Sequence, residues 1–387
     1  MKKFLFSFFI TQLFCSQIFS QGSWTQKANF PGTAREQAFA FSIGTKGYIG
    51  TGYDNSFAHY AFDFWEWDQT TNVWTQLSNF SGGIRSGAVG FSIGTKGYAG
   101  TGFNGTNLCS DFWEYDPAND SWTQKANLFS ATRQNAVGFS IGAKGYIGTG
   151  SNFNDFWEWD QSLNIWTQKQ NYGGGATQFA VGFSIGNLGY IGTGNSVLYG
   201  FWEWNPATNI WAQKASIPVG RIQATGFSSG TKGYIGTGYD GNSPMADFWE
   251  WNQSTNTWTQ QNNLSGAARY NAVGFSIGNF GYVSTGKNSS WLNDLWEFTP
   301  AGNVVNEIIY EDDIFVYPNP SAGKFQVSST KHQVSGIGVY DLSGEKVFET
   351  TLNQKQETIN LSEESGIYFL QITTSEGIVN KKIILKK

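Results

Sequence analysis

The chain repeats one short phrase, Gly-Tyr-Ile-Gly-Thr-Gly or a close variant, six times. Its successive tyrosines are separated by 50, 48, 44, 44 and 48 residues, at Tyr48, Tyr98, Tyr146, Tyr190, Tyr234 and Tyr282. A period of this length is typical of proteins built from repeated supersecondary units. Since a catalytic site is rarely written six times over, we expect the repeat to build a scaffold and function to lie where the copies differ.

The composition favours strands and turns. Aromatic residues make up 17% of the 387 residues and glycine occurs 48 times, whereas charged residues make up only 14%. The 24 Lys and Arg against 29 Asp and Glu give a net charge of −5. The chain therefore lacks the basic balance typical of nucleic-acid-binding proteins. Its length exceeds one ordinary core and indicates two or more structural units.

The first twenty residues are typical of a secretory signal. Lys2 and Lys3 precede an apolar stretch, Phe4–Phe14, and the small residue Ser20 closes the segment. The apolar stretch is too short for a helix that spans a membrane. We therefore predict a cleaved signal peptide at residues 1–20 and no transmembrane segment in the mature chain.

The two cysteines leave two questions open. Cys15 would allow a lipoprotein signal, although the bulky Phe14 beside it is wrong for a lipidation site. With Cys15 removed, Cys109 is the one remaining cysteine, which excludes an internal disulfide. Cys109 is either a reactive thiol or a small, partly buried loop residue.

Each repeat predicts four short strands. In the third repeat these are Ala136–Gly142, Gly145–Gly150, Asp155–Asp160 and Ile165–Gln168, separated by residues that favour turns. Alternating apolar and polar residues between such turns indicate β-hairpins. Six units of four strands fit an all-β, six-bladed β-propeller, in which each sheet packs face to face on the next.

Residue size varies along each repeat as a propeller requires. The first strand is rich in Ala and Gly, which suits the crowded centre. Tryptophan recurs on the third strand, where the wedge between blades is wider, at Trp65, Trp113, Trp157, Trp202, Trp249 and Trp296. Because every repeat carries this ring, packing between blades is a better interpretation than a sugar-binding platform.

The two ends of the array suggest how the ring closes. A tryptophan opens the fourth strand of five repeats, at Trp74, Trp122, Trp166, Trp211 and Trp258, but the sixth repeat has none. A spare copy, Ser23–Lys27, precedes the first repeat. We predict that this segment completes the sixth blade and removes an exposed sheet edge. The alternative closing strand is Asn303–Tyr310.

The repeats resemble the kelch family over about residues 22–300. The similarity lies in the glycine-rich second strand with its tyrosine, the acidic and aromatic third strand, and the tryptophan of the fourth. Many kelch units have a Gly-Gly pair where this chain has Gly-Thr-Gly, so it would be an atypical branch.

The repeats stop after Pro300, and the remaining sequence has a different pattern that indicates a second domain. Strand patterns broken by turns in Phe315–Val327, Gly338–Glu349 and Ile359–Lys387 predict a small antiparallel sandwich. The predicted organisation is a signal peptide at 1–20, a propeller at 21–302, a linker at 303–313 and a terminal domain at 314–387.

The terminal segment resembles the C-terminal sorting domain of proteins exported by type IX secretion. Motifs that match in order include Pro318, Asn319, Pro320, Gly323, Gly366, Tyr368, Lys381 and Lys382. The resemblance implies export by the type IX machinery of a Gram-negative bacterium, removal of the domain, and release or attachment at the cell surface. The alternative is an adhesive sandwich unrelated to sorting.

The predicted binding face carries the loops between second and third strands, which vary most among the repeats. They include His59, Tyr60 and Asp240. The same face receives five arginines: Arg35, Arg85, Arg133, Arg221 and Arg269.

Two interpretations of these arginines remain open. They could form an anion or carboxylate site around the channel mouth. Alternatively, each could pair with the acidic residue of its own third strand, at Asp63, Asp111, Asp155, Asp247 or Asp294. The fourth repeat has Thr177 and Gly200 in place of both partners, which favours local pairing.

The sequence predicts no catalytic residue, metal site or cofactor. His59 is the only histidine of the repeats, and no cluster of His, Cys and Asp has metal-ligand spacing. A third-strand glutamate recurs in every repeat, which indicates a structural role: Glu66, Glu114, Glu158, Glu203, Glu250 and Glu297. The favoured function is a secreted or surface protein that binds a protein or glycan. The alternative is an exported carbohydrate-active enzyme or sugar isomerase that uses the arginine-lined face.

Overall fold

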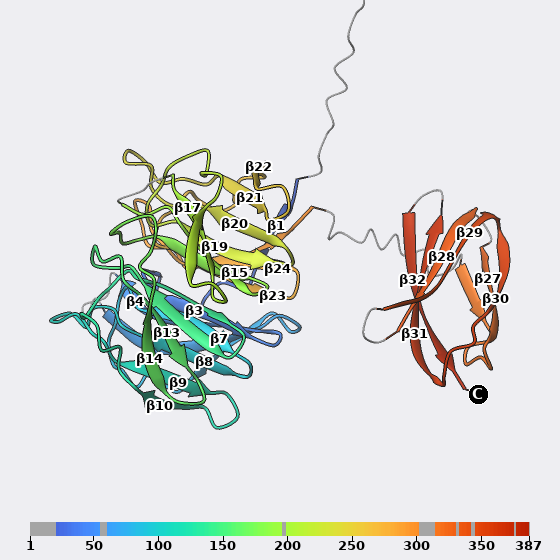
Figure 1. Ribbon diagram of the computed structural model, residues 1–387, viewed down its shortest axis with the longest axis horizontal. Coiled ribbons are helices and arrows are strands. Elements are labelled where there is room, and N and C mark those ends of the chain that lie inside the picture. The colour runs from blue at the N-terminus through green and yellow to red at the C-terminus, as the bar shows by residue number, and fades with distance from the viewer. Residues whose placement is uncertain are drawn as a thin grey trace, which may run out of the picture. The chain divides into compact units, whose positions relative to one another are not determined.

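The computed structural model describes residues 21–54, 60–195, 199–301, 314–329, 333–341, 345–374 and 377–386. The predicted signal peptide, the linker and the alternative closing strand Asn303–Tyr310 lie outside these residues. The chain divides into two compact units, Met1–Ala301 and Gly302–Lys387 (Figure 1). Each unit is described by itself.

The first unit contains six open antiparallel sheets, numbered one to six along the chain. Their first strands are β3 (Phe39–Ile43), β7 (Val89–Ile93), β11 (Val137–Ile141), β15 (Val181–Ile185), β19 (Thr225–Ser229) and β23 (Val273–Ile277). The second strands are β4 (Lys46–Asp54), β8 (Lys96–Gly100), β12 (Lys144–Gly148), β16 (Leu188–Gly192), β20 (Lys232–Gly236) and β24 (Phe280–Ser284). The third strands are β5 (Tyr60–Asp68), β9 (Phe112–Asp116), β13 (Phe156–Asp160), β17 (Phe201–Asn205), β21 (Phe248–Asn252) and β25 (Leu295–Thr299).

The fourth strands are β6 (Val73–Leu77), β10 (Ser121–Lys125), β14 (Ile165–Lys169), β18 (Ile210–Gln213), β22 (Thr257–Gln261) and, in sheet six, the N-terminal β1 (Ser23–Lys27). β1 pairs antiparallel with β25, from Ser23 opposite Thr299 to Lys27 opposite Leu295. Sheet one has an additional short strand, β2 (Arg35–Glu36), which pairs with β4.

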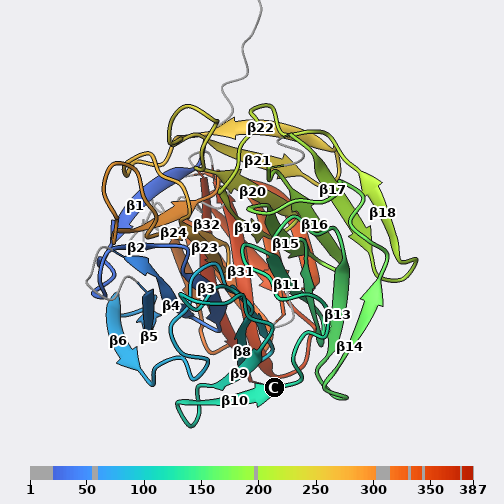
Figure 2. The same ribbon diagram turned by 90° about the vertical axis from the view of Figure 1, so that its left-hand side faces the viewer.

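The six sheets have a propeller-like arrangement. In Figure 2, β3, β11, β15, β19 and β23 lie toward the centre, whereas β1, β6, β10, β14, β18 and β22 lie at the rim. Each first strand neighbours the first strand of the next sheet, and β23 neighbours β3. The small residues expected at the centre are present, since Ala40, Gly90 and Gly138 line an axial channel.

Aromatic packing joins each sheet to the next. A Cβ on Gly281 would lie 1.9 Å from Phe227 of the preceding sheet, so only glycine allows this approach. Trp67 of sheet one is fully buried and lies 5.1 Å from Tyr282 of sheet six, centroid to centroid. Equivalent contacts of the same third-strand position occur at Tyr115, Trp159, Trp204, Trp251 and Phe298.

Each third strand carries two rings that contribute to this packing. The ring that the sequence analysis assigned to the wedge, exemplified by Trp157, is partly buried and packs against the cluster between two sheets, as predicted. The Trp157 indole donates a hydrogen bond to Asp155 at 2.7 Å, whereas Trp159, two residues later, is fully buried between sheets. Both indoles find an acceptor, since Trp159 donates to Asn164 Oδ1 at 3.2 Å, and they differ only in how deeply they lie in the interface.

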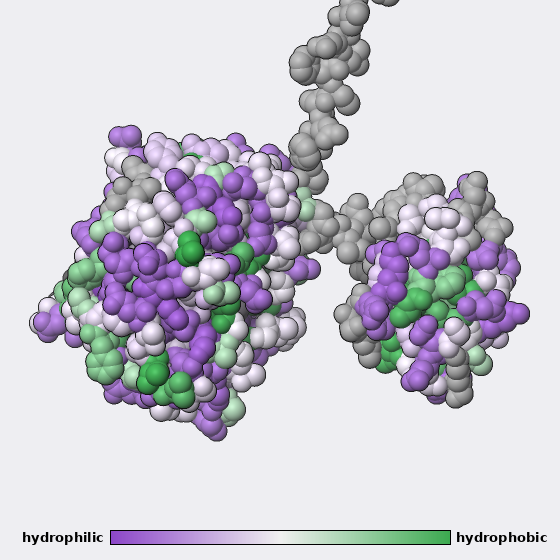
Figure 3. Space-filling view, viewed as in Figure 1, coloured by the Kyte–Doolittle hydropathy of each residue, from purple (hydrophilic) through white to green (hydrophobic). Residues whose placement is uncertain are grey.

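The second unit contains two antiparallel sheets around one apolar core. One sheet has the order β26 (Ile314–Tyr317), β27 (Lys324–Ser329) and β30 (Gln356–Asn360). The other has the order β29 (Lys346–Gln354), β28 (Val334–Tyr340), β31 (Gly366–Thr374) and β32 (Gly377–Leu385). Figure 3 shows a hydrophobic area flanked by hydrophilic residues on this unit, and Phe315, Tyr317 and Phe369 are among its exposed apolar side chains.

Candidate functional site

The variable loops and the connections into the first strands are neighbours on one face of the first unit. In four of the six sheets, an isolated or short bridge joins the residue after the arginine position to the residue after the Gly-Thr-Gly phrase or its variant. These bridges are Glu36–Tyr53, Ser86–Phe103, Ile222–Tyr239 and Tyr270–Lys287. The paired positions differ in chemistry from sheet to sheet, whereas the strands beneath them repeat. We call this surface the loop face.

At the centre of the loop face, six residues surround the channel mouth. All have left-handed backbone conformations, with φ between 53° and 61°: Gln37, Gly87, Asn135, Phe179, Gln223 and Asn271. The backbone N–H of each donates to the carbonyl of the preceding member at 2.8–3.2 Å, and Gln37 donates to Asn271. The six bonds form a complete cycle, so side chains at the mouth are held by a framework of backbone atoms.

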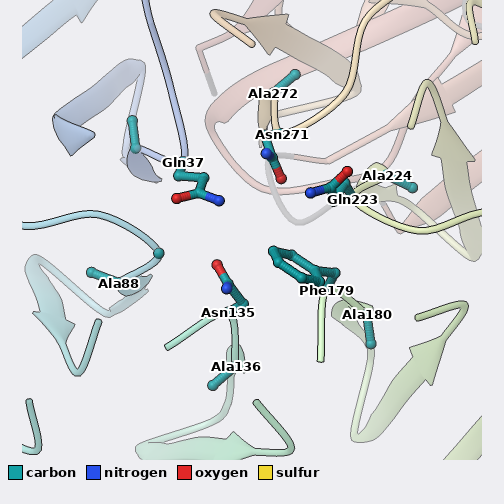
Figure 4. A pocket seen from close by; sticks show the side chains of 12 residues that line it. Gln37, Ala88, Asn135, Ala136, Phe179, Ala180, Gln223, Ala224, Asn271 and Ala272 are labelled. Atoms are coloured by element: carbon teal, nitrogen blue, oxygen red, sulfur yellow. The ribbon is translucent and has the colours of Figure 1, made fainter. Parts of the chain in front are cut away.

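The mouth encloses a cavity of about 110 Å³. Its lining comprises the six residues of the cycle and the alanine that follows each of them, among them Ala88 and Ala272. Figure 4 shows Gln37, Asn135, Phe179, Gln223 and Asn271 converging on the cavity. Four amides and one apolar ring therefore face the same space. Amides both donate and accept hydrogen bonds, so the mouth is polar without being charged.

The five arginines predicted from the sequence lie beneath this face. Their side chains are 0–2% exposed: Arg35, Arg85, Arg133, Arg221 and Arg269. Arg133 donates two parallel bonds to the Asp155 carboxylate, at 2.7 and 2.6 Å, and another to the carbonyl of Thr149 at 2.8 Å. The same triad joins the other arginines to Asp63, Asp111, Asp247 and Asp294 and to the corresponding threonine carbonyls.

This geometry supports local pairing over an arginine-lined anion site. All five N–H donors of Arg133 are engaged, the remaining two by Ala131 and Ser130. Burial alone would raise the pKa of the Asp155 carboxyl, but the hydrogen bonds from Arg133 and Trp157 outweigh it and hold that pKa below its usual range. The arginines therefore order their own sheets.

Sheet four lacks this triad. Thr177 occupies the arginine position and donates to Asn195 at 3.1 Å, while Gly200 occupies the aspartate position. The indole N–H of Trp202 is buried without a hydrogen-bond partner within the described residues. The sheet that breaks the pattern is also the one that places Phe179 at the mouth.

Partly buried aromatic side chains form an arc around one side of the mouth. The ring centroids of Trp291 and Tyr53 are 6.4 Å apart, those of Tyr53 and Tyr60 5.2 Å, and those of Tyr60 and Phe103 5.8 Å. These four residues, which we call the aromatic arc, come from sheets six, one and two. Tyr60 owes its position to the lengthened β4–β5 hairpin, in which Tyr53 pairs with Tyr60 beyond a bulge.

A charged pair lies beside the arc, between sheets six and one. The Lys287 ammonium is 3.9 Å from the Trp291 ring centroid and 3.5 Å from Glu36 Oε1. Asn271 donates to Glu36 Oε2 at 2.7 Å. Burial and the nearby Glu36 carboxylate raise the pKa of Tyr270. The cation is therefore already matched by an acid and an aromatic face.

The remaining residues named from the loops have mixed outcomes. Tyr60 belongs to the aromatic arc, whereas His59 lies outside the described residues. Asp240 is exposed, and its Oδ1 accepts the backbone N–H groups of Asn242 and Ser243, which lowers its pKa and fixes the loop turn. Burial raises the pKa of the Cys109 thiol, which favours the loop-residue interpretation over a reactive thiol.

The recurring glutamates have structural partners. Each accepts the hydroxyl of its sheet's second-strand tyrosine at 2.6–3.0 Å, and each pairs with a lysine. The described residues contain no group of three or more His, Cys, Asp and Glu placed to hold a metal ion. Within the same ranges, no helical segment has the length and apolarity needed to span a bilayer.

The other end of the channel offers less variety. It is lined by the same residue type in all six sheets: Ser42, Ser92, Ser140, Ser184, Ser228 and Ser276. A site that discriminates among ligands needs chemically distinct groups, so the loop face is the better candidate.

In the second unit, the structure brings distant parts of the predicted sorting signal together. Asn319 lies between Pro318 and Pro320, and its side chain donates to the carbonyl of Lys382 at 2.7 Å and accepts the N–H of Ile384 at 2.9 Å. Gly323, with φ of 100°, turns the chain beside Ser321. Elsewhere, Tyr368 donates to the carbonyl of Glu364, Gly366 pairs with Leu385, and Lys381 pairs with Leu370.

The sequence analysis did not identify the mouth residues or Trp291 as site candidates. The available signal was the column two residues after each arginine position, which varies among Gln, Gly, Asn and Phe and is followed by alanine in all six repeats. A comparison of the six repeats column by column would have shown this variation beside a constant position.

Comparisons with known proteins agree with this description of the two units. No curated protein matches the chain. The solved structure of YjhT has a TM-score of 0.62 and 17% sequence identity, and the match covers 72% of this chain and 98% of that one. This likeness supports the propeller-like fold alone. Residues 315–386 match the family model of the secretion system C-terminal sorting domain. The C-terminal segment is therefore a type IX sorting domain, and the chain carries a signal for export.

Proposed function

We propose that this chain is an exported, kelch-type six-bladed propeller that binds an extracellular protein or glycan through its loop face. In this proposal, residues 1–20 are a signal peptide, 21–302 the propeller, 303–313 a linker and 314–387 the sorting domain. The protein is secreted or held at the outer surface of a Gram-negative cell.

Three contacts between the ends of the array support a ring closed by the N-terminal strand. β1 pairs with β25 along all five of its residues. Trp67 of sheet one packs against Tyr282 of sheet six. The hydrogen bond from Gln37 to Asn271 completes the cycle at the mouth. A closed ring leaves no sheet face at its ends exposed to water.

The observation that carries the binding function is the contrast between a constant scaffold and a varied loop face. Five of the six first strands share the residues Gly-Phe-Ser at corresponding positions, and sheet one has Ala-Phe-Ser. The mouth instead carries amides, a glycine and a phenylalanine, and the aromatic arc of sheets six, one and two lies beside it. Varied groups on a rigid scaffold are typical of recognition surfaces.

The test is binding of the purified full chain to glycan and protein arrays. We expect specific ligands for the chain, and their loss in Tyr60→Ala, which changes the loop face. Ser140→Ala at the other channel end is the matched control and should bind as the parent does. Equal loss in both variants, or in neither, would contradict the assignment of the loop face.

The same purified chain also distinguishes a binding protein from the alternative, an exported carbohydrate-active enzyme or sugar isomerase. Bound sugars are incubated with the chain, and released or isomerised products are measured by chromatography. Because each arginine is committed to an aspartate and a backbone carbonyl, we expect no product. Turnover that Arg133→Ala abolishes without unfolding the chain would establish the enzyme instead.

A further inference from the structure

We propose that the loop face recognises an uncharged saccharide, with one sugar at the channel mouth and the adjoining sugars along the aromatic arc. This inference rests on the proposed binding function and narrows its ligand to one chemical class.

The aromatic arc supplies surfaces that suit sugar rings. A pyranose has weakly positive C–H groups on its faces, which are attracted to the negative face of an aromatic ring. Trp291, Tyr53, Tyr60 and Phe103 are each partly exposed, and successive centroids lie 5.2–6.4 Å apart. A row of rings so spaced contacts several sugars in succession.

The mouth supplies the complementary polar groups. Sugar hydroxyls donate and accept hydrogen bonds, and so do amide side chains. Gln37, Asn135, Gln223 and Asn271 face one cavity from four different sheets, and Phe179 faces it from a fifth. An apolar ring beside convergent amides matches a terminal sugar, which has an apolar face and a polar rim.

Charge separates neutral from acidic ligands at this face. The five guanidiniums are buried and each binds an aspartate through two N–H groups. The Lys287 ammonium lies between Glu36 and Trp291. Among the described residues of this face, a carboxylate or sulfate at the mouth would therefore approach Glu36 with no unpaired cation to match it, and its desolvation would be uncompensated.

The asymmetry of the face sets the direction of the ligand. Of the equivalent positions, sheets one, two and five carry Tyr53, Phe103 and Tyr239, whereas sheets three and four carry Ser151 and Asn195. The Asn195 side chain donates to Asn152 of sheet three at 2.9 Å, so these polar groups bind one another. The chain of sugars accordingly leaves the mouth toward sheets six, one and two.

The experiment measures the affinity of the full chain for neutral oligosaccharides and for their sialylated, uronic and sulfated counterparts by array and titration calorimetry. We expect neutral ligands to bind at least tenfold more tightly than matched acidic ones. Trp291→Ala should weaken neutral binding at least tenfold. Tyr199→Ala, which removes an exposed aromatic from the corresponding loop of sheet four, is the matched control and should change it less than twofold.

Phe179→Asn provides a second variant in which folding is not at risk. Asparagine suits the left-handed backbone better than phenylalanine, so the melting temperature should not fall. Neutral binding should weaken, because the apolar surface at the mouth is removed. Retained affinity in both Phe179→Asn and Trp291→Ala would overturn the inference.

The outcomes also separate this inference from the proposed function. Specific binding of proteins or acidic glycans, with no neutral saccharide bound, overturns the inference and leaves the binding function standing. The absence of any ligand across all classes for the folded chain overturns both.

Discussion

Removal of the Trp24 side chain tests whether β1 closes the array of sheets into a ring. The indole of Trp24 on β1 lies 5.0 Å from the Phe248 ring and 4.9 Å from the Phe298 ring. Its N–H donates to the carbonyl of Asn262 at 3.0 Å. In Trp24→Ala, sheets five and six lose a shared aromatic contact and a hydrogen bond that joins β1 to the array.

The magnitude follows from the burial of the ring. Replacing a fully buried tryptophan by alanine typically costs about 3–5 kcal/mol. That value applies to a fully buried ring. It is too large for Trp24, because this ring is only partly buried. We expect about 2–3 kcal/mol, the lost hydrogen bond included. With an unfolding entropy of about 2.1 cal/mol/K per residue, this lowers the melting temperature of a unit of this size by about 4 °C.

Differential scanning calorimetry of Trp24→Ala and Trp122→Ala measures the effect against a control. Trp122 occupies the equivalent position inside the array and lies 5.0 Å from both Phe64 and Phe80. We expect similar decreases for the two variants. Deletion of Ser23–Lys27 should be more severe, because it exposes the edge of β25 and promotes aggregation.

One result would refute the reasoning. If Trp24→Ala melts as the parent does while Trp122→Ala does not, β1 is not part of the closed ring. The alternative closing strand would then make Val305→Ala or Ile308→Ala the costly change.

Four further predictions concern the arginine triads and the tail. Arg133→Ala should lower the free energy of unfolding by about 3–5 kcal/mol, because it removes a fully buried side chain and leaves the partly buried Asp155 without its counter-charge. Since the folded-state pKa of Asp155 is depressed, the pair stabilises above about pH 4 and its contribution is lost as the pH falls through that lower pKa. Urea unfolding at pH 7 and pH 3 should show a smaller difference for Asp155→Asn than for the parent. In sheet four, Thr177→Arg with Gly200→Asp should be more stable than the sum of the single changes predicts, by about 1–3 kcal/mol; additive effects would contradict the triad. Deletion of Phe315–Lys387 should leave a folded propeller in the periplasm, detected by fractionation, and normal surface delivery would contradict the sorting assignment.

Much of the scaffold could be predicted because each repeat solves the same packing problem. The glycine before each repeated tyrosine recurs because a phenylalanine from the preceding sheet lies against it, as Phe227 does against Gly281. The pairing of Ser23–Lys27 with β25 could be predicted from the tryptophan missing in the sixth repeat. Such features can be predicted from the repeated pattern, because the alternation of side chains along a strand and the size of each residue together constrain the packing.

Other features depend on backbone directions that a single sequence does not specify. The arginine–aspartate pair could be predicted, but the third partner, the carbonyl of a threonine such as Thr149, could not. Thr149 has φ of 58°, a conformation that β-branched residues rarely adopt, and this turns its carbonyl toward Arg133. The sequence also could not show that Trp159 is more deeply buried than Trp157, because the two tryptophans lie two residues apart on one strand.

The backbone cycle at the mouth explains how one position can vary while the scaffold does not. Each of its six bonds joins an N–H to a carbonyl, so the cycle does not depend on which side chains its members carry. Left-handed backbone still favours glycine and asparagine, and Gly87, Asn135 and Asn271 conform to that preference. Phe179 does not, and a bulky residue in this conformation typically costs about 1–3 kcal/mol. Its ring faces the cavity instead of filling the interior between sheets. Because the scaffold gains nothing from phenylalanine there, this strain favours contact with a ligand over packing as the reason for the residue.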